Sequence, residues 1–182
     1  SCNPLIAPER YFDQGFEQFD SAPHIRHTGE VIDEVEEWIT KRAGARFFLY
    51  LHLVDTHDLY SLSESARRQV GLPDAPPEGM PPKGFANIRP LFLRGEGHDS
   101  NGNSIATKRI PIEHQDWLHH TYDAAVATAD EYVGQILDQL EALDLNDATI
   151  IIFTSDHGEE FFEHGLLSHG HSLHEELVRV PL

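Results

Sequence analysis

Two short, almost wholly apolar runs constrain the fold of this chain more than any other feature. The first run, RFFLYLHLV, covers residues 46–54, and the second, ATIIIFT, covers residues 148–154. Runs of this length that are rich in β-branched and aromatic residues are typical of strands buried on both faces. Such strands belong to sheets that helices cover, so the two runs favour an α/β fold.

Helical periodicity accompanies both runs. Apolar residues repeat at helical spacing after Thr28, which predicts an amphipathic helix over 29–42 with Thr28 as its N-cap. A longer apolar stripe predicts a second helix over 113–143. Residues 61–112 are rich in Pro and Gly and are predicted to form a long irregular insertion loop. This order of elements predicts a mainly parallel sheet sandwiched by helices.

Metal-capable side chains follow both predicted strands directly. The first strand runs into Asp55-Thr56-His57, and the second runs into Ser155-Asp156-His157-Gly158. In open α/β sheets ligands bind beyond the carboxyl ends of the strands, so we expect His57 and Asp156-His157 to lie at one sheet edge. A carboxylate beside an imidazole suits several divalent metals, including calcium, manganese and zinc.

Four further histidines follow the Asp156-His157 pair closely, and such dense histidine tracts are typical of metal or anion sites. They are His164, His169, His171 and His174. Taken one at a time, His164 and His174 are expected to be solvated loop residues.

The overall charge restricts the class of partner. The formal net charge is -18, which argues against non-specific nucleic-acid binding. An anionic substrate would need local positive charge from a metal or from histidines.

The single cysteine excludes an internal disulfide, and no apolar run is long enough to span a bilayer.

Four ordered motifs resemble the sulfatase family of the alkaline phosphatase superfamily. The stretch TIIIFTSDHGEEFFEHGLLSHGHSLHEELVRVPL at 149–182 is similar to the late metal-binding segment of sulfatases, and FFLYLHLVDTHDLY at 47–60 is similar to their FFLYLHxxDPHxPY stretch. ERYFDQGFEQFD at 9–20 and YDAAVATADEYVGQIL at 122–137 also match in pattern and order. The resemblance implies an alkaline-phosphatase-like α/β fold and hydrolysis of sulfate esters.

The resemblance also implies roles for individual residues. Asp156 and His157 match a pair of metal ligands, with calcium as the first expectation and manganese or zinc as alternatives. His57 matches the histidine that contacts the sulfate and the ester oxygen. His169 or His171 falls where many sulfatases have a sulfate-contacting lysine or histidine. We expect His169 to take the catalytic role and His171 to bind substrate, a small-molecule or carbohydrate sulfate ester.

Two parts of the sulfatase pattern are missing. The C/S-x-P-S/A-R motif, which is converted to formylglycine, is absent, as is the aspartate pair that supplies the other metal ligands. Cys2 begins Cys-Asn-Pro but lacks the required arginine, so we reject it as the nucleophile. We therefore expect residues 1–182 to be an incomplete fragment of one catalytic domain, inactive by itself, with the formylglycine upstream.

Two alternatives remain open. One is a phosphoryl-transfer or phosphonate monoester hydrolase member of the same superfamily, and the other is a non-catalytic metal-binding domain. The family resemblance favours a periplasmic or extracellular location.

Overall fold

The computed structural model describes residues 2–21, 24–57, 60–80 and 111–182. These residues divide into two compact units. The first unit comprises residues 1–70 and 123–149, and the second comprises residues 71–122 and 150–182. Residues 81–110, the larger part of the predicted insertion loop, lie outside the described residues.

Helices dominate the first unit. It contains the 3-10 turns η1 (Pro8–Arg10), η2 (Thr28–Glu30) and η3 (Asn146–Ala148) and the helices α1 (Ile32–Arg42) and α2 (Glu64–Gln69). Helix α1 confirms the helix predicted over 29–42, with Ile32 and Ile39 as its buried face. Helix α2 was not predicted, because six residues are too few for an apolar period to show. Its N-cap is Ser63, whose Oγ accepts a hydrogen bond from Ala66 N.

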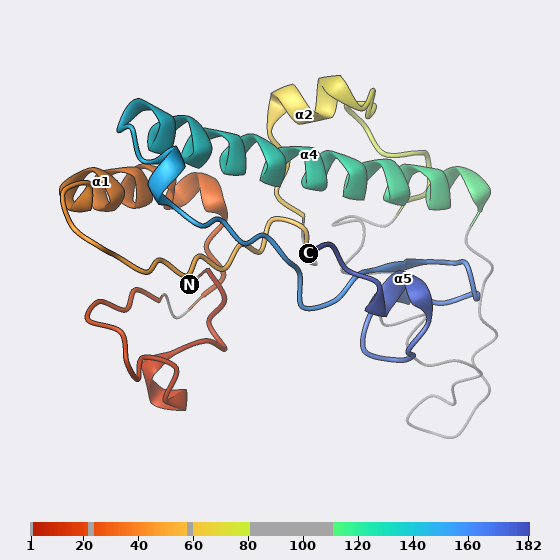
Figure 1. Cartoon of the computed structure of the whole chain (residues 1–182). Coiled ribbons are helices and arrows are strands. Elements are labelled where there is room, and N and C mark those ends of the chain that lie inside the picture. The colour runs from red at the N-terminus through yellow and green to blue at the C-terminus, as the bar shows by residue number, and fades with distance from the viewer. Residues whose placement is uncertain (1, 22–23, 58–59, 81–110) are drawn as a thin grey trace. The chain divides into compact units, whose positions relative to one another are not determined.

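Helix α4 (Ile112–Ala142) is the long element in Figure 1 and confirms the helix predicted over 113–143. The boundary between the two units falls within it, after Tyr122. In the first unit, Gln139 of α4 donates a hydrogen bond to Thr40 of α1. The hydroxyl of Thr128 donates a hydrogen bond to Ala124 O in the preceding turn of α4. The same hydroxyl accepts from Ser63 N, which fixes the start of α2 against α4.

The prediction of two strands, and with them of a parallel sheet, is not confirmed in the described residues. Neither 46–54 nor 148–155 is a strand there. The described residues form one small antiparallel sheet, in which β1 (Glu160–Phe161) pairs with β2 (Leu167–Ser168). The physical reason is that a strand needs a hydrogen-bonding neighbour, and an apolar run alone does not supply one.

Several side chains of these apolar runs are exposed. Ile150 and Ile152 are 89% and 76% exposed, and Phe48 is 74% exposed. The second run has the composition of a buried strand but is largely exposed, whereas the first run is partly buried and ends in the buried Val54.

The second unit ends in a short helix, α5 (Glu175–Val178), which follows the β1–β2 hairpin. Gly158 N donates to Leu177 O at 2.9 Å, which ties the segment before β1 to α5. A side chain at Gly158 would collide with the backbone carbonyl of Glu176, so this close approach requires glycine. Phe161 of β1 packs against Tyr122 of α4. No helix among the described residues is long and apolar enough to cross a membrane.

Candidate active site

A buried carboxylate fixes the loop that carries His57. Asp55 is fully buried, and its two oxygens accept from Thr28 N at 3.1 and 3.3 Å and from the Thr28 hydroxyl. Thr28 was predicted to cap α1, but its side chain is committed to Asp55 instead. At the start of η2, Glu30 Oε1 accepts a hydrogen bond from the backbone N of His27, the N-cap residue of this turn. Within the loop, His57 N donates to Val54 O, and Ser61 N donates to Asp55 O.

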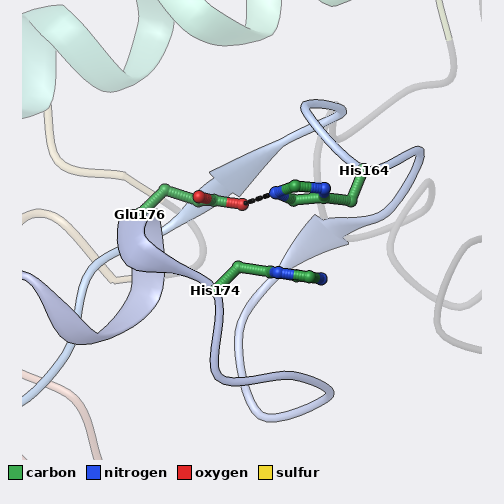
Figure 2. A group of neighbouring side chains, drawn as sticks. All are labelled: His164, His174 and Glu176. Atoms are coloured by element: carbon green, nitrogen blue, oxygen red, sulfur yellow. Dashed lines mark ion pairs between the residues drawn. The ribbon is translucent and has the colours of Figure 1, made fainter.

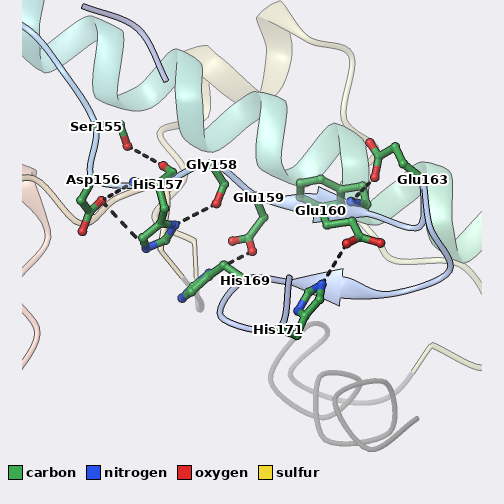
Figure 3. Close-up of polar contacts among 10 residues, drawn as sticks. Ser155, Asp156, His157, Gly158, Glu159, Glu160, Glu163, His169 and His171 are labelled. Carbon is green, nitrogen blue, oxygen red and sulfur yellow. Dashed lines mark hydrogen bonds and ion pairs between the residues drawn. The ribbon is translucent and has the colours of Figure 1, made fainter. Parts of the chain in front are cut away.

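The Asp156-His157 pair has the geometry expected of two ligands to one ion (Figure 3). His157 Nδ1 lies 2.8 Å from Gly158 O. Because a carbonyl oxygen only accepts, Nδ1 must carry a proton, and the lone pair of the neutral ring lies on Nε2. His157 Nε2 is 3.9 Å from Asp156 Oδ1, and that same oxygen accepts from His157 N at 3.1 Å. A ring nitrogen and a carboxylate oxygen therefore face each other.

These two residues fit a divalent metal. Histidine ligands commonly donate the other ring nitrogen to a backbone carbonyl, and His157 does so. The Asp156 side chain is 72% exposed, which leaves room for further ligands. The groups of three metal-capable side chains that cluster within the described residues include neither Asp156 nor His157. The pair thus offers two ligands and needs others to complete a site.

His169 lies directly against this pair. The rings of His157 and His169 have centroids 4.0 Å apart. His169 Nδ1 contacts Glu159 Oε1 at 3.0 Å, and this carboxylate is almost completely buried, with 3% of the side chain exposed. A ring whose Nδ1 is held by a carboxylate offers Nε2 to a ligand. Of the two histidines left open by the motif, His169 is the one in contact with His157.

His171 makes a separate buried pair. Its Nε2 lies 2.8 Å from Oε2 of Glu160, whose side chain is fully buried. Burial acts to raise the pKa of Glu160, but hydrogen bonds from His171 and from the amides of Leu166 and His164 outweigh it, so the pKa lies below its ordinary value. His171 therefore has a structural partner, and its predicted role in substrate binding stays a prediction.

The second unit contains four of the five predicted site residues. His57 belongs to the first unit, whereas Asp156, His157, His169 and His171 belong to the second. The common sheet edge that would join His57 to the others therefore stays a prediction.

Sequence reasoning missed Glu159 and Glu160, the carboxylates that hold His169 and His171. The one signal in the sequence that could have pointed to them is the glycine-containing turn that separates them from the histidines. A hairpin turn at Glu163-His164-Gly165 folds the Glu159-Glu160 pair back onto the His169-Gly170-His171 segment, with β1 and β2 as its arms. The glycine at 165 has φ 82, a left-handed conformation that marks such a turn.

Cys2 is unsuited to be a nucleophile, as the motif analysis concluded. Its side chain is packed with Val31 and Val54 in the core of the first unit and is 2% exposed. Burial raises the pKa of the thiol to about 11. Only a small fraction is thiolate at neutral pH, and the thiolate is the reactive form.

Comparison with known proteins supplies the family. The sulfatase family model matches residues 8–182, nearly the whole chain. Human iduronate 2-sulfatase is 36% identical over 89 residues, which are 49% of this chain and 16% of that enzyme. The ulvan-active sulfatase of Formosa agariphila is 50% identical over 57 residues, 31% of this chain and 11% of that protein.

A longer match is to the multifunctional alkaline phosphatase superfamily protein PehA of Trinickia caryophylli. It is 28% identical over 156 residues, which are 80% of this chain and 29% of that protein. The chain thus spans less than a third of each of these three relatives. No solved structure matches the chain significantly. The family match implies an alkaline-phosphatase-like α/β fold, and on its extent this chain belongs to the sulfatase family.

Proposed function

We propose that the complete protein hydrolyses sulfate esters of small molecules or carbohydrates. The family match supports this reaction class. The observation that carries the proposal is the hydrogen bond from His157 Nδ1 to Gly158 O, because it turns the lone pair of Nε2 toward the Asp156 carboxylate. A fixed imidazole nitrogen beside a carboxylate is what a divalent metal requires from two of its ligands.

Asp156 and His157 would hold the metal, with further ligands from outside this chain. Calcium follows from the family resemblance, whereas the imidazole nitrogen also suits manganese or zinc. When bound, such an ion neutralises charge on the sulfate oxygens and polarises the sulfur centre for attack. By the family resemblance the attacking group would be a formylglycine, and the buried Cys2, whose thiol pKa is raised to about 11, is not suited to that role.

His169 is proposed to contact the sulfate. Its Nδ1 is held by the nearly buried Glu159 carboxylate, which orients the ring, and Nε2 would contact a sulfate oxygen. Glu159 is therefore a positioning residue. His171, paired with Glu160, is proposed as a neighbouring substrate-binding residue.

His57 is proposed to act at the ester oxygen, either by stabilising negative charge or by protonating the leaving group. Its loop is anchored by Asp55 and by the backbone hydrogen bond from His57 N to Val54 O, so the backbone that carries the imidazole is held in place. We further propose that residues 1–182 are part of one catalytic domain and that the parent protein is periplasmic or extracellular.

The metal assignment is tested with the Asp156→Ala variant of the complete protein. We expect it to lose one bound metal ion per chain, measured by elemental analysis, together with aryl sulfate hydrolysis. Asp138→Ala is the matched control, because Asp138 is an exposed aspartate on α4. Unchanged metal content in Asp156→Ala would refute the ligand assignment.

The role of His57 is tested with two substrates. A general acid or a charge stabiliser contributes about 10²–10⁴-fold in rate. His57→Ala should lose most of that factor on an unactivated sugar sulfate and much less on an activated aryl sulfate. Equal, small losses on both would contradict a role at the leaving group. Faster turnover of a phenyl phosphonate than of the matched sulfate would instead favour the phosphonate monoester alternative.

A further inference from the structure

A second group of metal-capable side chains shares no residue with the Asp156-His157 pair. His164 lies in the loop between β1 and β2, His174 is the N-cap of α5, and Glu176 lies in the first turn of that helix. Figure 2 shows the two imidazole rings side by side with the Glu176 carboxylate at their edge. One ligand atom from each residue lies within 4.8 Å of the other two.

One carboxylate oxygen of this group is buried, and its contact within the group is an ion pair with His164 rather than a hydrogen bond. Glu176 Oε1 is inaccessible to solvent and makes no hydrogen bond to the described part of the chain. It lies 2.9 Å from His164 Nε2, but without the alignment of a hydrogen bond. Burial of an ionised oxygen without such a partner is unfavourable. A cation shared with the imidazoles would compensate it.

The two rings are arranged as a pair. The centroids of His164 and His174 are 3.6 Å apart, and the ring planes differ by 18°. Stacked in this way, the two rings each bring one nitrogen into the same small group of ligand atoms. A neutral imidazole has a ring nitrogen available as a metal ligand.

The backbone that carries these residues is held in place by contacts outside the group. Glu160 Oε1 accepts from His164 N and Leu166 N, at 3.2 and 3.1 Å, and this fixes the hairpin loop. The hydrogen bond from Gly158 N to Leu177 O fixes α5. Because the backbone is already ordered, binding of an ion would require little further loss of conformational entropy.

A neighbouring acidic group competes for the same carboxylate. Glu160, Glu163 and Glu176 also lie within 4.8 Å of one another. However, Glu160 already accepts three hydrogen bonds, and Glu163 Oε2 accepts from Phe161 N at 2.6 Å. Glu176 is the member whose buried oxygen lacks a hydrogen bond, so the histidine side of the group is the better candidate site.

We propose that His164, His174 and Glu176 form a binding site for a transition-metal dication of the zinc class. Two imidazoles and one carboxylate are a ligand set that zinc uses, whereas calcium prefers oxygen ligands throughout. Zinc bonds of about 2.0–2.2 Å would draw the ligand atoms together by side-chain rotation. His164 and His174 are exposed, so a fourth position is open to water or to a ligand. This site is independent of the sulfatase activity proposed above.

The test uses the complete protein in an Asp156→Ala background, so that the first pair does not contribute. After treatment with a chelator, we measure Zn²⁺ binding by calorimetry and Co²⁺ binding by visible absorption. We expect one ion per chain to bind. Adding His174→Ala or Glu176→Gln should weaken binding by more than the roughly 10–100-fold that loss of an outer-shell partner costs.

Two controls separate this site from other histidines and acids. His24→Ala removes an exposed histidine elsewhere, and Glu175→Gln removes the carboxylate next to Glu176. Both should leave Zn²⁺ affinity within about threefold, which is roughly half a kcal/mol or a little more. Circular dichroism checks that each variant is folded. If the Asp156→Ala protein does not fold, His157→Ala is used as the background variant in its place. Absence of Zn²⁺ binding in the background protein, or equal affinity in His174→Ala and its control, would overturn the proposal.

Discussion

Replacement of Asp55 should destabilise the protein strongly, because this carboxylate joins the His57 loop to the start of α1. In Asp55→Ala, the amide and hydroxyl of Thr28 both lose their acceptor, and both residues are fully buried. A buried donor left without a partner costs about 1–3 kcal/mol. Two such donors set the expected loss in the free energy of unfolding at about 2–6 kcal/mol.

Asp55→Asn provides a graded comparison. The amide keeps one carbonyl oxygen, which can still accept one of the two hydrogen bonds, so the expected loss is about 1–3 kcal/mol. If His57 acts on the ester, this variant should also lower kcat more than it raises KM, because the loop that positions the imidazole is loosened.

The assay is urea unfolding followed by far-ultraviolet circular dichroism, with unchanged m-values as the sign that only stability has changed. Asp138→Ala on the exposed face of α4 is the control and should stay within about 0.5 kcal/mol of the wild type. A loss of less than about 1 kcal/mol in Asp55→Ala would refute the reasoning, since it would mean that Thr28 finds other acceptors.

Three further predictions follow from single residues. Cys2, with a pKa of about 11, should react with iodoacetamide at pH 8 at least about a hundredfold more slowly in the native protein than in urea, and equal rates would contradict its burial. The pKa of Glu160 is depressed below 4.5, so its carboxylate stabilises the fold above that pH and loses this contribution in acid. The free energy of unfolding of Glu160→Gln should therefore vary less between pH 6 and pH 3 than that of the wild type. Gly158→Ala should lower stability by about 1–3 kcal/mol through collision with the Glu176 carbonyl. Gly134→Ala, which has open space within α4, should raise it by about 0.5–1 kcal/mol, and equal shifts in thermal unfolding would contradict the close approach at Gly158.

The long helices were predictable because their signal is local. The apolar period that predicted 29–42 and 113–143 reflects side chains on one face of one element, and α1 and α4 follow it closely. The two predicted strands depended on partners that sequence patterning does not supply. Their composition was read correctly as apolar, aromatic in the first run and β-branched in the second, yet no strand forms there in the described residues.

The same distinction between local and non-local signals applies to the candidate site. Asp156 and His157 could be proposed from the sequence because they follow an apolar run and precede a glycine, and their role as metal ligands stays a prediction. The partners of His169 and His171 could not, since the contacts to Glu159 and Glu160 span 10 and 11 residues across a hairpin whose arms are only two residues long. The buried link from Thr28 to Asp55 spans 27 residues and has no local pattern at all.

The exposed isoleucine run has a consequence for handling the protein. Residues 149–153 are β-branched or aromatic and contain neither a charge nor a proline, a composition typical of segments that stack into cross-β fibrils. Asp147 and Asp156 flank the run, and repulsion between chains of charge -18 opposes their association. High salt screens that repulsion, so these 182 residues, purified by themselves, should be kept at low ionic strength to remain in solution.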